Sequence, residues 1–371
     1  FPEDENLSRE AVREIKFEEL FTFQLKIQET KMKKDQMDEV YIIDYDVTAI
    51  QQFTASLPFE PTGAQKRVIN EICADFKSPF KMKRMLQGDV GSGKTMVAAS
   101  AIVAAYTAGR QTAFMVPTEI LAEQHASSLS EMFAGLDLSL ALMTGSTTDK
   151  QKKKIVEELS AGRLDVVVGT HALIQDPVEF ADLGFVIIDE QHRFGVKQRE
   201  TLEEKGSFTN ILYMTATPIP RSMALTSFGD MSMSIIDELP KGRKPVDTRW
   251  IQSPDDQKID VLVEKSLSEG GQVYVINALI DESETVDLQT ALESYEEYRS
   301  RYEPRFKVGL LHGKMTADEK DDMMRAFKEN EIQILIATTV IEVGVDVPNA
   351  NLMVIYDAER FGLAQLHQLR G

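Results

Sequence analysis

The stretch GDVGSGKT at residues 88–95 is the part of the sequence whose residue types and spacing point most directly to chemistry. It satisfies the pattern G-x-x-x-x-G-K-[ST] and lies between an apolar run ending at Leu86 and the alanine-rich stretch 96–106. In such a loop consecutive backbone N–H groups face an anion, and the following helix adds positive charge from its N-terminus. We therefore expect nucleotide phosphates to be held by Gly88, Gly91, Ser92 and Gly93.

Phosphoryl transfer also needs side chains that bind the reacting phosphates, hold the metal ion and activate water, and four side chains could supply these functions. Lys94 should reach the β- and γ-phosphates, and the Thr95 hydroxyl should bind Mg²⁺. Asp189 and Glu190 follow the apolar run 185–188, which would carry them to the carboxyl edge of a sheet. We expect Asp189 to hold magnesium directly or through water, and Glu190 to take a proton from the attacking water. An Asp-Glu pair after a strand can also cap a helix, so the assignment of Asp189 and Glu190 depends on the presence of the loop at residues 88–95. The cofactors expected are ATP and Mg²⁺.

Short apolar runs flanked by Gly, Pro or Thr alternate with helical patterns along most of the chain. They lie at 84–86, 113–116, 140–143, 166–168, 185–188 and 211–214, and again at 273–276, 308–311, 334–337 and 352–355. This alternation predicts an α/β fold whose parallel sheets are covered on both faces. Residues 237–250 hold prolines and a glycine without periodicity, which predicts an interdomain linker.

A helix is expected near the N-terminus, over residues 8–38, with Ser8 as its N-cap. Its apolar residues recur near helical spacing and predict a packing face made of Val12, Ile15, Leu20 and Phe21.

Composition excludes several classes of protein. With 371 residues, 43% hydrophobic and 27% charged, the chain is globular rather than disordered or fibrous. A formal net charge of −19 argues against a passive nucleic-acid coat, although a basic groove remains compatible with it. The sequence has no apolar run of membrane-spanning length, no secretory pattern and a single cysteine, Cys73. We expect a cytoplasmic piece of a longer chain that has no membrane partner.

The ordered series of motifs resembles superfamily 2 helicases, and RecG-like helicases in particular. Besides the phosphate loop and Asp189-Glu190-Gln191-His192, the resemblance rests on LPFEPTGAQ (57–65), PTEILAEQH (117–125), TGS (144–146), GTH (169–171), TAT (215–217), LHGKM (311–315) and ATTVIEVGVDVP (337–348).

The resemblance implies roles for further residues. The amide of Gln65 would pair with the adenine edge and Phe59 would stack on the ring. The alternatives are that Phe59 is a core residue and that Gln65 only begins a helix. Gly344 and Asp346 would lie towards the nucleotide, and His192 would couple the γ-phosphate site to the second domain. Phosphates of one DNA strand would be bound by Pro117, Thr118, Thr144, Gly145, Thr170, His171, His312, Gly313, Thr338 and Thr339. Thr118 and Thr170 would serve equally well as helix N-caps.

The family's fold is a pair of RecA-like P-loop NTPase domains in tandem. The resemblance divides the chain into an N-terminal linking helix at 1–50 (the end of a missing wedge region), an ATP-binding motor domain at 51–240 and a second motor domain at 241–371. The last residues, QLHQLRG at 365–371, match only the beginning of the family's motif VI, whose next arginines are absent. Activity of this chain alone should therefore be impaired.

The expected function is ATP-dependent remodelling of branched DNA, such as Holliday junctions and stalled replication forks, in recombination and repair. The expected partners are branched DNA and replication or repair proteins, and the expected state is a monomer in the bacterial cytoplasm. Two alternatives stay open: a duplex DNA translocase like the transcription-repair coupling factor, and an ATP-dependent interaction switch without strand separation.

Overall fold

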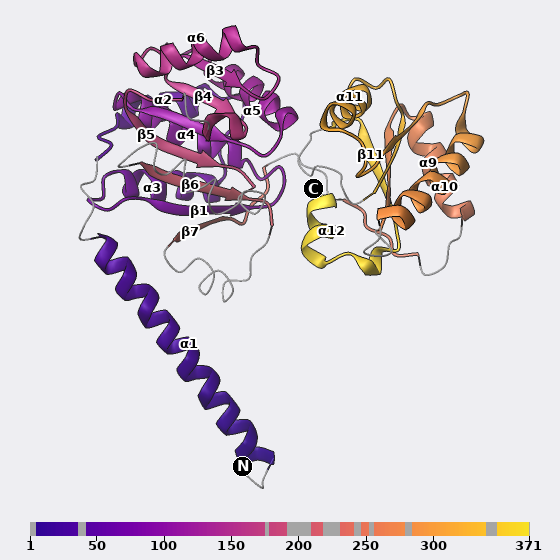
Figure 1. The fold of residues 1–371 in the computed structure, drawn as a ribbon, viewed down its shortest axis with the longest axis horizontal. Helices are drawn as coiled ribbons and strands as arrows, with labels where there is room; N and C mark the ends of the chain where they lie inside the picture. Colours follow the sequence, from indigo (N-terminus) through magenta and orange to yellow (C-terminus); the bar gives the residue numbers. More distant parts are fainter. Residues whose placement is uncertain are drawn as a thin grey trace. The chain divides into compact units, whose positions relative to one another are not determined.

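The computed structural model describes residues 5–35, 42–174, 178–190, 209–217, 231–240, 246–251, 256–278, 284–338 and 347–370. The chain divides into two compact units, Phe1–Gly242 and Arg243–Gly371, and each is described by itself (Figure 1).

The first unit is built on a seven-stranded sheet. Its strands are β1 (Lys83–Gly88), β2 (Gln111–Met115), β3 (Leu140–Met143), β4 (Val166–Gly169), β5 (Leu183–Ile188), β6 (Asn210–Thr215) and β7 (Ser232–Ile236). Neighbouring strands are parallel and follow the order β3-β4-β2-β5-β6-β1-β7. The connecting helices are α2 (Val47–Ser56), α3 (Gly63–Phe76), α4 (Lys94–Thr107), α5 (Glu119–Met132), α6 (Asp149–Ser160) and the short 3₁₀ helix η1 (His171–Ile174).

Both faces of this sheet are buried, as the unbroken apolar runs predict. Along β5, Phe185 and Ile187 belong to one core cluster while Val186 and Ile188 belong to a second cluster on the opposite face. The first cluster also holds Ile43, so the packed core starts before the predicted boundary at residue 51. The lone Cys73 lies in the same cluster, and burial raises the pKa of its thiol to about 11.

Strand β7 has no counterpart among the predicted strands. Its sequence, Ser-Met-Ser-Ile-Ile, contains no apolar run, and only Ser234 and Ile236 of it are buried. It lies at the edge of the sheet beside β1, where hydrophobic periodicity gives the weakest signal.

The second unit is a smaller sheet of the same kind. Its strands β8 (Gln272–Asn277), β9 (Val308–Leu311), β10 (Ile334–Thr338) and β11 (Ala350–Tyr356) are parallel, in the order β11-β8-β10-β9. One face packs Val273 and Val275 against Tyr302, and on the other Tyr274 meets Phe327 with ring centroids 4.6 Å apart. The helices are α9 (Asp256–Ser268), α10 (Glu284–Tyr302), α11 (Ala317–Lys328), α12 (Leu363–Arg370) and the 3₁₀ helix η3 (Ala358–Arg360).

Helix α1 (Glu5–Asp35) confirms the predicted N-terminal helix but begins earlier than expected. Ser8 lies inside it rather than at its N-cap, because helical backbone already starts at Glu5. The apolar positions that predicted a packing face are exposed, at 47% for Val12, 58% for Ile15, 54% for Leu20 and 53% for Phe21. That packing is therefore not made by the described residues. No helix in the described part of the chain is both long enough and apolar enough to cross a membrane.

Phe185→Ala should lower the free energy of unfolding of the first unit by about 3–5 kcal/mol, because it empties a fully buried site. The ring of Phe185 meets that of Phe76 edge to face, with centroids 5.1 Å apart, so the change also removes this contact. Urea denaturation measures the loss. The matched control is Phe80→Ala, which removes a side chain that is 47% exposed and should shift stability far less. Equal losses in the two variants would contradict the assignment of the core.

Candidate nucleotide and DNA site

The strands of the first sheet end level with one another, and this brings the predicted site residues to one edge. Met115 pairs in register with Gly169 and with Ile188, Ile188 pairs with Tyr213, and Gln87 pairs with Thr215. The segments that follow β1, β2, β4, β5 and β6 therefore all leave the sheet at its carboxyl edge. In open parallel sheets this edge is where ligands bind.

The phosphate loop (residues 88–95) takes a conformation that needs its glycines. Gly93 has φ +88°, in the left-handed region, and a Cβ there would lie 2.3 Å from Nε2 of Gln65. A Cβ on Gly88 would lie 2.5 Å from the hydroxyl oxygen of Ser92. The Lys94 ammonium donates to the carbonyl of Gly88 at 2.8 Å and to that of Asp89 at 3.1 Å. It is thus held within the loop, at the N-terminus of α4.

These residues fit a nucleotide phosphate. The hydroxyl of Ser92 is buried and has no hydrogen-bond partner among the described residues. A buried orphan hydroxyl is uncommon, so it favours a ligand that supplies the missing bond. Thr95, the second residue of α4, is half-buried.

Gln65 connects the next helix to this loop. Thr62 caps α3, and a reciprocal capping box joins the Gln65 backbone N–H to the Thr62 hydroxyl at 3.2 Å and the Thr62 N–H to Oε1 of Gln65 at 2.8 Å. The Gln65 amide also donates to the carbonyl of Ser92 at 2.7 Å. Gln65 thus lies in the first turn of a helix, as the alternative interpretation expected, and it also contacts the phosphate loop. One N–H and one lone pair of its amide remain for a ligand.

Phe59 is 49% exposed, so the alternative that it is a core residue is wrong.

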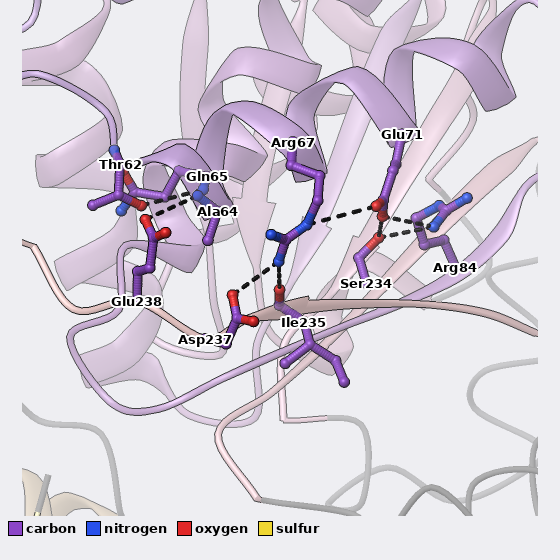
Figure 2. A network of polar contacts seen from close by, with 10 residues as sticks. All are labelled: Thr62, Ala64, Gln65, Arg67, Glu71, Arg84, Ser234, Ile235, Asp237 and Glu238. Carbon is purple, nitrogen blue, oxygen red and sulfur yellow. Dashed lines mark hydrogen bonds and ion pairs between the residues drawn. The ribbon is translucent and has the colours of Figure 1, made fainter.

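Helix α3 is in turn fixed to β7 by a network of polar contacts (Figure 2). Glu238 accepts from the Ala64 N–H at 3.0 Å, one residue from Gln65. Arg67 donates to the carbonyl of Ile235 and to the carboxylate of Asp237, both at 2.9 Å. The beginning of the predicted linker is therefore anchored on the helix that contacts the phosphate loop. Nothing in the periodicity of the sequence indicated these contacts.

Asp189 and Glu190 lie just past the end of β5 and are buried. The Asp189 N–H continues the ladder to the carbonyl of Met115 at 2.9 Å. One carboxylate oxygen of Asp189 accepts from the Glu190 N–H at 3.0 Å, and the other lies 3.0 Å from Nε2 of His125. Glu190 has φ 49°, a left-handed conformation that is costly for a residue with a side chain and is enriched at functional sites.

The electrostatics of Asp189 suit a metal ligand. Burial on its own would raise the pKa of this carboxyl, but the hydrogen bond from His125 and the positive charge of Lys94 outweigh it and hold the pKa below its usual value of 3.8. An ionised carboxylate is a ligand that Mg²⁺ prefers. Within the described residues no cluster of three or more His, Cys, Asp or Glu could form a metal cage. Mg²⁺ is usually bound by one or two carboxylates together with phosphate oxygens and water, and the ionised carboxylate of Asp189 is a ligand of this kind.

The predicted DNA-contacting residues of the first unit lie in neighbouring loops at the same edge. Thr118 caps α5, since its hydroxyl accepts from the Leu121 N–H at 3.4 Å, which bears out the helix-cap alternative for this residue. The Thr170 hydroxyl caps nothing: it is buried and has no partner among the described residues. Pro117 is half-buried and His171 is exposed at the start of η1.

Glu119 joins two of these loops. One of its carboxylate oxygens accepts from the Ser146 N–H at 3.1 Å and the other from the Ser146 hydroxyl at 2.5 Å. The Thr144 hydroxyl contacts the same Ser146 hydroxyl at 2.8 Å, and a Cβ on Gly145 would lie 2.6 Å from the Glu119 carboxylate. The Thr144-Gly145 turn is thereby held against the first residue of α5.

The second sheet brings its predicted residues to a carboxyl edge of its own. Ala337 pairs with Leu311 and Thr338 pairs with Asn277. Thr338 at the end of β10 and the segment His312-Gly313 after β9 therefore lie at the same edge. In the described part of the chain, Nδ1 of His312, the Thr338 hydroxyl and Nδ2 of Asn277 are buried without partners. Burial lowers the pKa of His312. His192, Thr339, Gly344 and Asp346 lie outside the described residues.

Several site residues were missed by reading the sequence. His125 occupies the buried face of α5 between Leu121 and Leu129, and a polar ring on an apolar stripe needs a partner, which was the available signal. Asn277, at the end of an apolar strand, gave a similar signal. The contacts of Glu119 and Glu238 depend on tertiary structure, and no signal in the sequence indicated them.

Comparison with known proteins identifies the family. Residues 62–226 match the DEAD/DEAH box helicase family, and residues 257–371 match the helicase conserved C-terminal domain. The chain is 51% identical over its whole length to the ATP-dependent DNA helicase RecG of Bacillus subtilis, and 54% identical over 99% of its length to that of Staphylococcus epidermidis. A solved structure of RecG bound to a three-way DNA junction superposes on 100% of this chain with a TM-score of 0.87 and 46% identity.

The chain has a RecG-like superfamily 2 helicase core. It spans about half the length of the relatives it matches, 54% of each of the two curated helicases and 48% of the solved RecG chain. The comparison confirms both the predicted resemblance and the predicted fold of two RecA-like domains in tandem. The helicase Lhr of Mycobacterium smegmatis, at 18% identity and a TM-score of 0.60 over 87% of this chain, shares the fold.

Gly93→Ala should weaken ATP binding by the RecG-like core at least ~10-fold, because the new methyl group would strain the backbone and collide with Gln65. Gly109→Ala is the matched control: Gly109 has φ +71°, also in the left-handed region, but a Cβ there meets nothing within 4 Å. It should lower stability by about 1 kcal/mol and leave ATP affinity unchanged. Equilibrium titration with a fluorescent ATP analogue measures both, and equal affinities would contradict the account of the loop.

The contact between Glu119 and Ser146 should be pH-dependent. Burial raises the pKa of Glu119, but hydrogen bonds from Ser146 and Gly145 dominate and hold it below its usual 4.5. A lowered folded-state pKa means that the carboxylate stabilises the fold above the unfolded-state pKa, and that this stabilisation disappears as pH falls through the folded-state value. The difference in unfolding free energy between wild type and Glu119→Gln should therefore be constant from pH 6 to 8 and shrink below about pH 4.5. The exposed Glu131→Gln on the same helix is the control, and a pH-independent difference would contradict this reading.

Proposed function

We propose that the protein is an ATP-dependent DNA helicase or translocase that remodels branched DNA, such as Holliday junctions and stalled replication forks, in recombination and repair. The observation that carries the proposal is the shared carboxyl edge of the first sheet, which joins the phosphate loop, the Asp189-Glu190 pair and the Thr118 and Thr170 loops. Strong identity to helicases named RecG, over essentially the whole chain, supports branched DNA as the substrate.

The ATP-binding residues would be those of the phosphate loop together with Gln65 and Phe59. Lys94 lies among the loop carbonyls, from which it would turn to the β- and γ-phosphates. The remaining donor and acceptor of Gln65 would pair with the adenine edge, and the exposed ring of Phe59 would stack on the base. Gly344 and Asp346 are proposed to approach the nucleotide from the second domain.

Hydrolysis would use the residues after β5. Thr95 and Asp189 would hold Mg²⁺, which when bound neutralises charge on the phosphates. Glu190 would accept a proton from the attacking water, and its left-handed backbone fixes where its carboxylate can lie. His192 is proposed to couple this site to the second domain.

The DNA-binding residues would form one row on each domain. Backbone N–H groups and hydroxyls that follow strand ends bind phosphates without reading sequence. The buried, unpartnered hydroxyls of Thr170 and Thr338 and the Nδ1 of His312 support this role. The remaining members of the two rows are Pro117, Thr118, Thr144, Gly145, His171, Gly313 and Thr339.

The domain assignment is proposed as a linking helix at 1–50, an ATP-binding motor domain at 51–240 and a second motor domain at 241–371, with Ile43 of the linking segment packed into the core of the first motor domain. The division of the chain after Gly242 supports the second boundary. We further propose a cytoplasmic monomer that acts with replication or repair proteins. Relatives named RecG favour this function over a transcription-coupled translocase, and the buried pair of Asp189 and Glu190 favours hydrolysis over a pure binding switch.

ATP hydrolysis with and without a three-way DNA junction tests this function. The protein extended through both flanks should be stimulated by the junction, and Glu190→Gln should lower kcat about 10²–10⁴-fold with ATP still bound, because it removes the proposed base. Glu179→Gln, in the same unit but exposed, is the matched control and should leave kcat unchanged.

If the extended protein hydrolyses ATP but ignores junctions and responds to a protein partner, the function is that of a switch or a polymerase-pushing translocase. If Glu190→Gln retains full activity, the catalytic assignment is wrong.

A further inference from the structure

His125 is a buried polar residue that the proposed catalytic roles do not use. It is 7% exposed on the inward face of α5, and its ring packs against that of Phe114 with centroids 4.8 Å apart. Its Nε2 lies 3.0 Å from Oδ2 of Asp189, which is itself 7% exposed. An ionised carboxylate can only accept, so Nε2 is the donor in this pair.

The contact restricts the Asp189 carboxylate in a specific way. The Glu190 N–H binds one of its oxygens and His125 binds the other, so the plane of the group is set from two sides. Each oxygen keeps a lone pair that a cation or a metal-bound water can use. Residues that orient a ligating carboxylate in this way typically change metal affinity when they are removed.

Helix α5 also carries the loop that is proposed to touch DNA. Thr118 caps this helix, Glu119 ties its first turn to the Thr144-Gly145 turn, and His125 follows about two turns later on the same rigid element. A displacement of the loops that are proposed to contact DNA would therefore move the imidazole that holds Asp189. The backbone bond from Asp189 to Met115 joins β5 to β2, the strand from which α5 departs.

We propose that His125 is a positioning residue: it orients Asp189 for the magnesium ion and transmits the state of the DNA-contacting loops to that carboxylate. This inference rests on the proposed function and adds a link between its two sites. The link is a single hydrogen bond between α5 and the residue after β5.

Two substitutions separate this role from packing. His125→Leu keeps an apolar side chain against Phe114 but donates no hydrogen bond, whereas His125→Gln restores an N–H donor. The first measurement, on the extended protein, is Mn²⁺ binding in the presence of ADP, followed by electron paramagnetic resonance. His125→Leu should weaken Mn²⁺ binding about 10–100-fold and His125→Gln should recover most of it, while ADP binding in EDTA stays unchanged in both. Ser127→Ala, exposed on the same helix, is the control and should match wild type.

The second measurement is the ratio of ATP hydrolysis rates with and without a DNA junction at saturating Mg²⁺. This ratio should fall in His125→Leu and recover in His125→Gln. A merely structural role would lower the melting temperature of the variants without moving Mn²⁺ affinity or this ratio, and that result would overturn the inference. If wild type binds Mn²⁺ with ADP and is stimulated by DNA, but His125→Leu behaves identically, only the role of His125 falls. If wild type itself binds no Mn²⁺ with ADP, the proposed ATP site falls with it.

Discussion

The common register of the first unit's parallel sheet, which is buried on both faces, determines where the loops at its carboxyl edge emerge. Because Met115, Ile188 and Tyr213 are aligned, the segments after three different strands must emerge side by side. Burial on both faces prevents a strand from slipping, since a shift of one residue would exchange Phe185 and Val186 between two separate cores. Hydrophobic packing thus fixes the distance between the phosphate loop, the Asp189-Glu190 pair and the loops after β2 and β4, which are proposed to contact DNA.

Polar contacts then attach the surrounding helices to this edge. Gln65 joins α3 to the phosphate loop through Ser92, and Glu238 joins the same helix to the segment after β7. His125 joins α5 to Asp189. Each of these two helices therefore carries one contact to the edge where nucleotide is proposed to bind and another to a segment outside it. In the proposed motor, which would convert ATP hydrolysis into movement, such paired contacts would connect the two events.

Most of the strands and the phosphate loop could be predicted from the sequence, because the signals that identify them are local. Unbroken apolar runs identified ten strands and the G-x-x-x-x-G-K-T string identified the loop after β1. Edge strand β7 was not predicted because it lacks a continuous apolar run, and its burial does not follow hydrophobicity, since Ser234 is buried while Ile235 is exposed. The packing expected of α1 was wrong for the described residues because periodicity reports an apolar face but not what covers it. The bonds of Gln65, His125 and Glu238 join residues far apart in the chain, which spacing cannot report.

If nucleotide and DNA are bound at one mechanically connected edge, as proposed, each ligand should change the affinity of the protein for the other. The affinity of the extended Glu190→Gln protein for a three-way junction should be measured with and without Mg·ATP, and its ATP affinity with and without the junction. Both affinities should change by the same factor, on the order of 5–150-fold, because coupling between two sites is reciprocal. Junction affinity that is indifferent to ATP, in a protein that binds both, would contradict it.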